Sequence, residues 1–285
     1  MKMQAVYNTI INDLTKLFNR ITPYNKFIIG LSGGLDSAVV AALCTFAVGK
    51  ENVITYNLPS ATNSEKTKQL AEQIAGRLDI KYHVKPIESM YQALVSHMEM
   101  SDVDKGNLQA RIRGLMLQTF ASAKKGVCIS CSNKTERMTG YFTYTSADDT
   151  GAIAPIGDLY KTEVFQLGEF INKYHGEELI PTELLLVDGK VEIYPSAELI
   201  GAGNDPFDFW IDDVLIEMLL HDNERAISIH KKYKSDPLLK AFVDKVYKDS
   251  DTFFERLVEL EKMINSSEWK RDQCPPIIRV NKREE

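Results

Sequence analysis

The sequence lacks a long apolar run and has few cysteines. No stretch approaches the roughly 20 apolar residues that a helix needs to cross a bilayer, and Asn and Asp interrupt the amphipathic first 20 residues, unlike in an export signal. The four cysteines are too few and too scattered for the disulfide framework of a small secreted domain. We therefore expect a cytoplasmic protein that does not associate with membranes.

An excess of basic residues is also absent. Lys and Arg number 34 against 40 Asp and Glu, which gives a net charge of −6. This balance argues against a protein that binds the phosphates of nucleic acid in bulk. There is no internal repeat or low-complexity segment, and 285 residues with 44% hydrophobic content are enough to bury a substantial core. The sequence thus predicts a globular chain without nucleic acid as a partner.

Short apolar runs alternate with longer helical patterns in the first half of the chain. Buried strands are predicted at 26–31, 52–57, 80–84 and 126–130, and helices at 36–48, 64–78, 106–123 and 161–174. This order is typical of repeated β-α-β units and predicts an α/β fold with a doubly wound parallel sheet. The stretch 176–209 is irregular, with a hairpin expected around Asp188 and Gly189.

Helical periodicity returns in the last third of the chain, at 210–221 and 237–264. We expect a single domain over residues 1–285, with a core at about 20–175 and a helical C-terminal segment at about 205–285. The charged, Pro-containing end of the chain is expected to be extended or partly mobile.

One predicted strand ends in small and charged residues, in the stretch KFIIGLSGGLDSAVV at 26–40. Ser32, Gly33 and Gly34 follow the strand and lead into a helix, and backbone N–H groups in such a turn form an anion site. The glycines let the backbone approach a phosphate, and the Ser32 and Ser37 hydroxyls add donors. Asp36 would repel a phosphate unless a divalent cation lay between them. The Gly-Gly pair alone is equally typical of a tight turn or helix cap, and the loop lacks the spacing of a Walker or dinucleotide-binding motif.

The full sequence Ser-Gly-Gly-Leu-Asp-Ser resembles the signature of the ATP pyrophosphatases, which cleave ATP between its α and β phosphates and adenylate an oxygen of the substrate. Six other segments narrow the resemblance. They are NLPSATNSEKTKQLAEQIAGRLDI (57–80), GNLQARIRGLMLQTFA (106–121), SNKTERMTGYFT (132–143), APIGDLYKTEVFQL (154–167), YPSAEL (194–199) and EWKRDQCPP (268–276). Together they resemble the synthetase domain of NAD synthetases over about residues 5–278, more closely the glutamine-dependent version than the short ammonia-dependent one.

This resemblance implies a Rossmann-like fold of the adenine nucleotide α-hydrolase type, with ATP at the C-terminal ends of the strands. It also implies a C–N ligase that adenylates the carboxylate of deamido-NAD (nicotinic acid adenine dinucleotide) and then forms NAD with ammonia. ATP, Mg²⁺, deamido-NAD and ammonia would be its small-molecule partners. The family is homodimeric, with substrate between the subunits, and helix 106–123 would contribute to the interface.

The resemblance also assigns roles to individual residues. Asp36 and Glu136 correspond to the magnesium carboxylates, and Lys161 corresponds to a lysine that contacts ATP phosphate; these three form the expected catalytic set. The expected ATP-binding positions are Gly30, Leu31, Ser32, Gly33, Gly34, Leu35, Asp36, Ser37, Cys131, Lys161 and Ser196. The expected substrate-binding positions are Arg111, Tyr144, Asp148, Asp149 and Lys270.

The sequence departs from the family pattern in several places. Cys131 stands where the family usually has a threonine near ATP. Tyr144 stands where short bacterial forms have a substrate-binding lysine, and Asp148 or Asp149 would replace a displaced aspartate. The run that usually follows PSAEL is reduced to GAGNDPFDF at 201–209. These changes concern the acceptor substrate more than the ATP chemistry.

Three alternatives stay open at this stage. The C-x-x-C spacing of Cys128 and Cys131 is compatible with metal or redox chemistry, although its apolar strand pattern and the lack of a second Cys or His cluster favour a buried, inert pair. The chain could amidate or thiolate another adenylated acceptor, or be a catalytically silent nucleotide-binding subunit. Because the chain begins close to the Ser-Gly-Gly loop, we expect no amidase domain, so nitrogen would come from free ammonia or from a separate glutaminase subunit.

Overall fold

Four parallel strands form the central sheet of the computed structural model, which describes residues 2–21, 23–147, 149–187, 190–191, 207–221 and 224–280. Strand β1 (Phe27–Gly30) pairs with β2 (Val53–Asn57) and with β4 (Val127–Cys128), and β3 (Lys81–Val84) pairs with β2. The strand order is therefore β3-β2-β1-β4, and all four predicted strands and their parallel arrangement are confirmed. The chain adds strands outward from β1 to β3 and then crosses to the other side of β1. Sheets of this kind bind ligands at the carboxyl ends of the strands beside that switch point.

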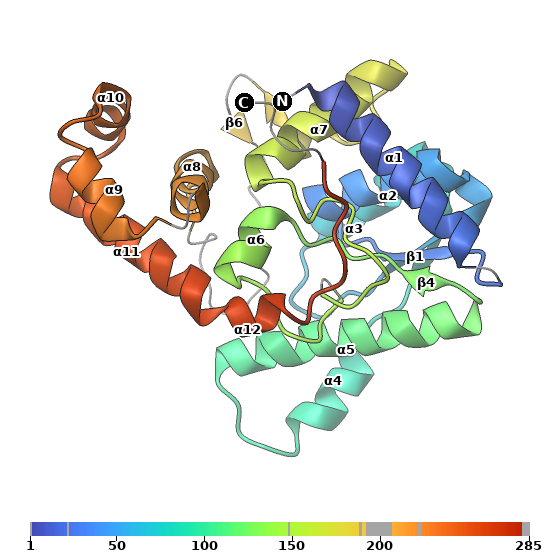
Figure 1. Cartoon of the computed structure of the whole chain (residues 1–285). Coiled ribbons are helices and arrows are strands. Elements are labelled where there is room, and N and C mark those ends of the chain that lie inside the picture. Colours follow the sequence, from blue (N-terminus) through green and yellow to red (C-terminus); the bar gives the residue numbers. More distant parts are fainter. Residues whose placement is uncertain are drawn as a thin grey trace.

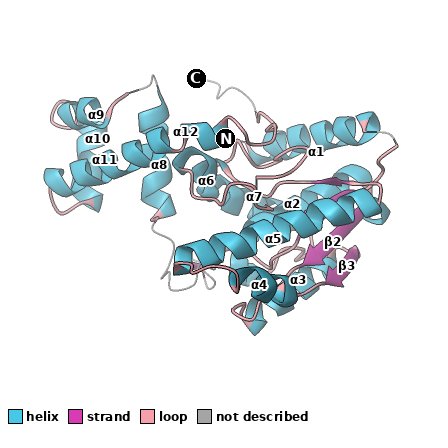
Figure 2. Ribbon diagram, turned by 90° about the horizontal axis from the view of Figure 1, so that it is seen from below, coloured by secondary structure: helices cyan, strands magenta, loops and turns pink. Residues whose placement is uncertain are grey.

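Helices cover both faces of the sheet, which makes the fold doubly wound (Figure 1, Figure 2). One face carries α1 (Met3–Arg20), α2 (Leu35–Val48), α3 (Glu65–Arg77) and α7 (Lys161–His175), and the other carries α4 (Glu88–Val95) and α5 (Asp102–Ala123). Phe27 and Ile29 of β1 pack in the hydrophobic cluster of the first face, whereas Ile28 packs in that of the second. Strands β1 and β2 are buried and mostly apolar because helices cover both of their faces. The prediction of a buried strand at 80–84 is wrong in part, because β3 lies at the edge of the sheet, where Lys81 and Val84 are exposed.

The C-terminal helices form a second hydrophobic cluster beside the sheet domain (Figure 1). They are α8 (Phe209–Leu220), α9 (Ala226–Lys232), α10 (Pro237–Val246) and α11 (Ser250–Ser266), and the short α12 (Glu268–Arg271) follows without adding a side chain to the cluster. The helical periodicity predicted at 237–264 is divided between two helices, because α10 ends at Val246 and α11 begins at Ser250. The Asp249 carboxylate accepts the Thr252 N–H at 2.8 Å, and this N-cap starts a new helix.

Short elements complete the fold. The six-residue helix α6 (Lys134–Thr139) follows β4, and single 3₁₀ turns occupy η1 (Lys50–Asn52) and η2 (Thr182–Leu184). Strand β5 (Leu186–Val187) pairs antiparallel with β6 (Lys190–Val191), as the predicted hairpin requires, while its turn residues Asp188 and Gly189 lie outside the described residues. None of the helices in the described ranges is long and apolar enough to cross a bilayer.

After α12, the chain runs in extended form back to the core. The Ala154 N–H donates to the Pro276 carbonyl at 2.7 Å, and Ala154 and Ile277 form a parallel bridge. Ile278 and Val280 are buried, at 2% and 3% exposure. The predicted extended end is therefore confirmed through Val280, and packing against the core fixes its course.

Candidate active site

The turn after β1 is closed by its own serine hydroxyls. Ser32 Oγ accepts the Gly34 N–H at 3.2 Å and lies 3.1 Å from Ser37 Oγ, which donates to the Gly34 carbonyl at 3.0 Å. Gly34 is the N-cap of α2, so the first N–H groups of this helix face the turn. Gly33 has φ +91°, and a Cβ there would lie 2.0 Å from the Thr67 carbonyl oxygen of α3. Only glycine fits this position, and the turn is held tightly against α3.

Three of the expected ATP-binding positions can reach a ligand only through their backbone. Gly30 ends β1, and a Cβ there would meet the Leu117 side chain at 3.0 Å. Leu31 and Leu35 are buried in the main cluster, at 0% and 4% exposure. Their side chains build the core beneath the turn.

A buried ion pair joins α2 to α7 beside the turn. The Lys161 ammonium, on the first residue of α7, donates to Asp36 Oδ2 in the first turn of α2. The Lys161 side chain is only 3% exposed, and Asp36 is 18% exposed. A lysine so buried needs an anionic partner to keep its charge. The structure thus brings together two of the three expected catalytic residues, although 125 positions separate them.

Asn133 connects Asp36 with Glu136, the third expected catalytic residue. Its side-chain amide donates to Asp36 Oδ1 at 3.4 Å, and its Oδ1 accepts the Glu136 N–H at 3.0 Å. The Asn133 N–H donates in return to Glu136 Oε2 at 3.3 Å, which completes a capping box at the start of α6. We did not single out Asn133 from the sequence, although an Asn followed three residues later by a Glu is the signal of such a box.

The donor set around Asn133 fits a magnesium ion that is shared with phosphates. Carboxylates offer about four acceptor sites each, so Asp36 and Glu136 can each accept more than one ligand. Mg²⁺ usually takes one or two carboxylates and completes its shell with phosphates and water. Within the described ranges, no group of three or more His, Cys, Asp or Glu side chains could hold a metal by itself. The pair is therefore suited to a metal that arrives with a nucleotide.

Four of the expected substrate residues meet at a second place, formed by α5, α12 and the segment 140–150. Arg111 Nε of α5 donates to the Tyr144 carbonyl at 3.3 Å, and the Tyr144 hydroxyl donates to Gln273. Lys270 of α12 donates to the carbonyls of Gly140 and Phe142 at 2.9 and 3.0 Å. Arg111 and Lys270 therefore fix the course of this segment from two sides.

Asp149 lies buried in the same group, at 5% exposure. Its Oδ2 accepts the Thr145 N–H at 2.8 Å, whereas its buried Oδ1 has no hydrogen-bond partner among the described residues. Burial raises the pKa of Asp149, against the effect of nearby backbone N–H groups and of Lys270. Burial likewise lowers the pKa of Lys270, with Asp149 acting against it and Arg111 adding to it. The free oxygen leaves one acceptor for a bound molecule or a water.

The remaining expected residues are separate from these groups or cannot be placed. Asp148 and Ser196 lie outside the described residues. Cys131 is buried at 8% exposure in the main cluster, and Cys128 packs in the α5 cluster on the other face of the sheet. None of the four cysteines, all within the described ranges, forms a disulfide, and burial raises the pKa of Cys128 to about 12. These positions agree with an inert pair.

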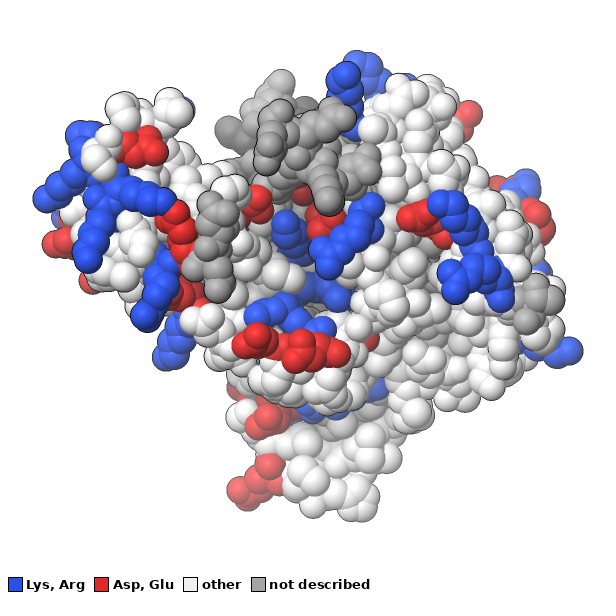
Figure 3. Space-filling model, viewed as in Figure 1, with Lys and Arg blue, Asp and Glu red and all other residues white. Residues whose placement is uncertain are grey.

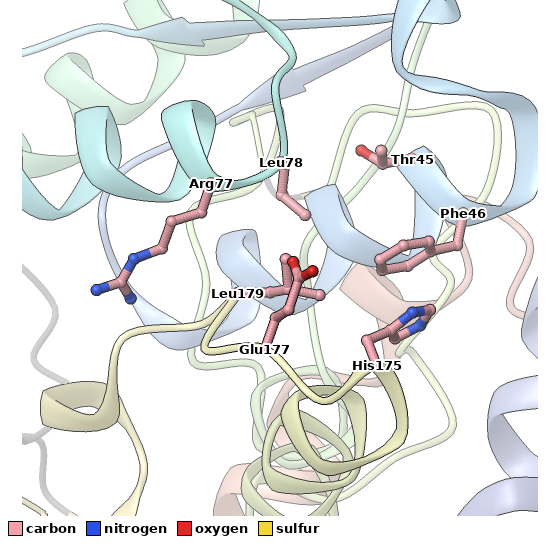
Figure 4. Close-up of a pocket in the computed structure, with 7 residues that line it drawn as sticks. All are labelled: Thr45, Phe46, Arg77, Leu78, His175, Glu177 and Leu179. Atoms are coloured by element: carbon pink, nitrogen blue, oxygen red, sulfur yellow. The ribbon is translucent and has the colours of Figure 1, made fainter.

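A pocket of about 250 Å³ lies elsewhere, where α2, α3 and α7 end (Figure 4). Thr45, Phe46, Arg77 and His175 line it, and His175 stacks on Phe46 with ring centroids 3.8 Å apart. The turn after β1 and Lys161 lie at the opposite ends of α2 and α7, and no expected site residue lines this pocket. Lys and Arg side chains gather instead over α6 and α12, between the C-terminal helices and the core (Figure 3). These side chains lie over the helices that carry Glu136 and Lys270.

Comparison with known proteins gives a consistent set of matches. The family model described as NAD synthase matches residues 6–274. A glutamine-dependent NAD(+) synthetase of Thermotoga maritima is 28% identical over 99% of this chain and 46% of its own length. An NH(3)-dependent NAD(+) synthetase of Wolinella succinogenes is 32% identical over 91% of this chain and 90% of its own length. The chain spans less than half the length of the glutamine-dependent relative.

Among solved structures, an NMN synthetase from Francisella tularensis matches with a TM-score of 0.69 and 25% identity. The match covers 95% of this chain and 96% of that one. The α/β architecture described above is thus shared along almost the whole chain.

Proposed function

Because this chain belongs to the NAD synthase family, we propose that it uses ATP to amidate the nicotinate carboxylate of deamido-NAD with ammonia, giving NAD, AMP and pyrophosphate. One observation supports the proposal most directly. The Ser32–Ser37 turn, the Asp36–Lys161 pair and Glu136 lie together at the switch point of the sheet. Family membership supplies the reaction class, and this geometry supplies a place for the phosphates.

The proposed reaction has two steps. A carboxylate oxygen of the acceptor attacks the α-phosphorus of ATP, and the bond to the bridging oxygen breaks as pyrophosphate leaves. Ammonia then attacks the carbonyl carbon of the acyl-adenylate, AMP leaves with the bonding electrons, and the nitrogen loses a proton. The N–H groups of the turn and the Lys161 ammonium are placed to receive the negative charge of the leaving pyrophosphate, and fixed donors of this kind stabilise charge that develops in the transition state.

Asp36 and Glu136 would hold Mg²⁺ together with the phosphates of the nucleotide. The bound ion would supply further neutralisation of the phosphate oxygens. The chain itself keeps the charge of Lys161 in a buried place, where electrostatic interactions are stronger than in water.

We place the acceptor at the second group, where Arg111, Tyr144, Asp149 and Lys270 meet. Arg111 and Lys270 are held close to the backbone of segment 140–150, and Asp149 offers its unused oxygen. The contacts of Asp148, Ser196 and Cys131 stay predictions.

A cytoplasmic location and a homodimer are also proposals. Exposed apolar side chains on and beside α4 and α5, including Leu94, Val103 and Leu115 at 46%, 58% and 59% exposure, support a covered face there.

One observation favours a second acceptor. One of the solved structures that match nearly from end to end is an NMN synthetase, and segment 141–150 is a place where this sequence departs from the usual pattern of NAD synthetases. A mononucleotide that bears the same carboxylate is therefore the rival substrate. The nitrogen source is the other open choice, since both NH(3)-dependent and glutamine-dependent relatives match.

The test is to incubate the purified chain with ATP, magnesium and deamido-NAD or its mononucleotide counterpart, with ammonium or glutamine in separate reactions. We expect NAD, AMP and pyrophosphate in equal amounts with deamido-NAD and ammonium. NMN formation alone would favour the mononucleotide. Activity only with glutamine and an added glutaminase would indicate a partner subunit. ATP binding without pyrophosphate release in any arm would indicate a silent nucleotide-binding subunit.

Matched variants make the assay specific. Lys161→Met should remove activity, because it takes the buried ammonium away from the phosphate site and leaves Asp36 without its partner. Lys16→Met is the control, since the Lys16 side chain is 72% exposed on α1. Equal loss in both variants would contradict the proposed role of Lys161.

A further inference from the structure

Asp213 of α8 is a buried carboxylate that belongs to neither group described above. It is 4% exposed, and both of its oxygens accept hydrogen bonds from other helices. Asp213 Oδ1 accepts the Thr135 hydroxyl at 2.5 Å, and Oδ2 accepts the Thr162 N–H at 2.9 Å and the Thr162 hydroxyl at 2.8 Å. One side chain therefore connects α8 to α6 and to α7.

The two threonines are the direct neighbours of two expected catalytic residues. Thr135 precedes Glu136 in α6, and Thr162 follows Lys161 in α7. The Lys161 N–H donates to Thr135 Oγ1 at 2.9 Å, so the same hydroxyl serves Lys161 and Asp213. The first N–H groups of a helix have no partner within the helix, and here α6 and α8 supply partners at the start of α7. The direction in which Lys161 leaves α7 is fixed by this network.

We propose that Asp213 is a positioning residue that holds the start of α7, and thereby Lys161, at a fixed place relative to Glu136. This inference rests on the proposed function, in which both residues serve the ATP phosphates. It makes the C-terminal helices part of the ATP site, although α8 lies outside the sheet domain. A group displaced by about 1 Å can lose on the order of 100-fold in rate, so the precision of such a support affects turnover.

Asp213→Asn is an informative substitution because it keeps the shape of the side chain. The amide has one acceptor oxygen and one NH₂ donor, whereas Asp213 accepts hydrogen bonds on both sides. With the oxygen toward Thr162, the NH₂ group would donate to Thr135 Oγ1, whose own proton would lose its present acceptor. With the amide reversed, the NH₂ group would face the Thr162 N–H, and in either orientation the start of α7 would shift or loosen. The adjacent Asp212 provides the control. It is 2% exposed and pairs with Arg256 of α11 through two hydrogen bonds of 2.6 and 2.9 Å, within the C-terminal cluster.

The experiment measures kcat, KM for ATP and the thermal midpoint for wild type, Asp213→Asn and Asp212→Asn. We expect Asp213→Asn to lower kcat about 10- to 100-fold, as supporting residues of active sites often do, with a smaller change in its thermal midpoint than Asp212→Asn shows. Asp212→Asn should be less stable but keep a kcat within about twofold of wild type. A kcat for Asp213→Asn equal to that of wild type would overturn the proposal, as would equal losses of kcat in both variants.

Thr135→Val gives a second route if Asp213→Asn does not fold. It removes the hydroxyl that Asp213 and the Lys161 N–H share, so it should lower kcat by a similar factor. The double variant should lose no more than the worse single variant, because both changes act on one network. A loss of kcat in the double variant equal to the product of the two single losses would contradict a shared network.

ATP binding separates this inference from the proposed function. If wild type binds ATP but makes no NAD, the proposed reaction is wrong. Weaker binding of ATP by Asp213→Asn, with unchanged binding by Asp212→Asn, would then still support the positioning role.

Discussion

The two halves of the site are built in different ways. The turn after β1 takes its shape from contacts within residues 32–37, where Ser32, Gly34 and Ser37 bond to one another. Segment 140–150 takes its course from partners far away in the sequence, because Arg111 and Lys270 bind its carbonyls from α5 and α12. A motif can carry the first kind of structure from one protein to another. The second kind depends on the surrounding fold, and it is here that this chain departs from the family pattern.

The largest effect should follow from Asp36→Ala, which tests the first half. The change removes the partner of the buried Lys161 and one expected magnesium ligand. We expect kcat to fall by at least about 100-fold, the order found when a single stabilising group is removed from an active site. Asp13→Ala is the control, because Asp13 pairs with Lys16 on the surface. An active Asp36→Ala protein would show that the turn works without the pair.

Gly33→Ala tests how tightly the same turn is built. The new Cβ would lie 2.0 Å from the Thr67 carbonyl oxygen at a φ of +91°, so both the clash and the backbone strain oppose it. We expect about 2–4 kcal/mol less stability and weaker ATP binding. Gly76→Ala in α3 meets nothing within 4 Å and should raise stability by up to about 1 kcal/mol. Chemical denaturation measures the free energy of unfolding of both variants. Equal stabilities would show that the turn can shift to make room for the new Cβ of Gly33→Ala.

The pH dependence of stability tests whether distant groups also hold the first half. Burial raises the pKa of Asp213 from 3.8 to about 6, with hydrogen bonds from Thr135 and Thr162 acting against this and the Glu163 charge adding to it. The folded protein therefore binds the proton more tightly than the unfolded chain, and it loses stability as pH rises from about 4 to about 6. Relative to Asp213→Asn, wild type should lose up to about 3 kcal/mol between these pH values. If the difference in unfolding free energy between wild type and Asp213→Asn did not change with pH, Asp213 would have an ordinary pKa.

Lys270→Met tests the second half alone. The substitution removes the ammonium that holds the Gly140 and Phe142 carbonyls but keeps an apolar side chain over the Phe142 ring. We expect KM for the acceptor to rise about tenfold, the worth of one lost hydrogen bond to a charged group, with KM for ATP unchanged. Lys262→Met on α11 is a matched surface control. Equal changes in the KM for ATP and in the KM for the acceptor would show that the two halves of the site do not act separately.

The smallest effect should come from Cys131→Ser. Cys131 is buried in the main cluster, and a serine nearly matches its volume. We expect kcat to stay within about twofold of wild type, with a modest loss of stability from the buried hydroxyl. A large loss of activity, measured with Cys128→Ser alongside, would show that the thiol at this position has a role in ATP binding.

Local patterns explain what could be predicted from the sequence and what could not. Short runs of strand-forming residues predicted the four strands. The Ser-Gly-Gly turn could be inferred because its hydrogen bonds join residues that are close together in the sequence. Helix α6 was missed because six residues carry no readable periodicity, and the break before Ser250 was missed because a single N-cap, Asp249, interrupts an otherwise helical pattern. The role of Asp213 could not be inferred, since its partners lie 78 and 51 positions away.

The return of the chain to the core after α12 has a mechanical consequence. The C-terminal helices leave the sheet domain before α8 and rejoin it where Pro276 and Ile277 bind along Ala154. An outward swing of these helices would have to break the contacts of Pro276 and Ile277 with Ala154. Lys270 lies six residues before Pro276, on the short stretch that leads to the second attachment. Its position should therefore follow movements of the core more closely than movements of α9 and α10.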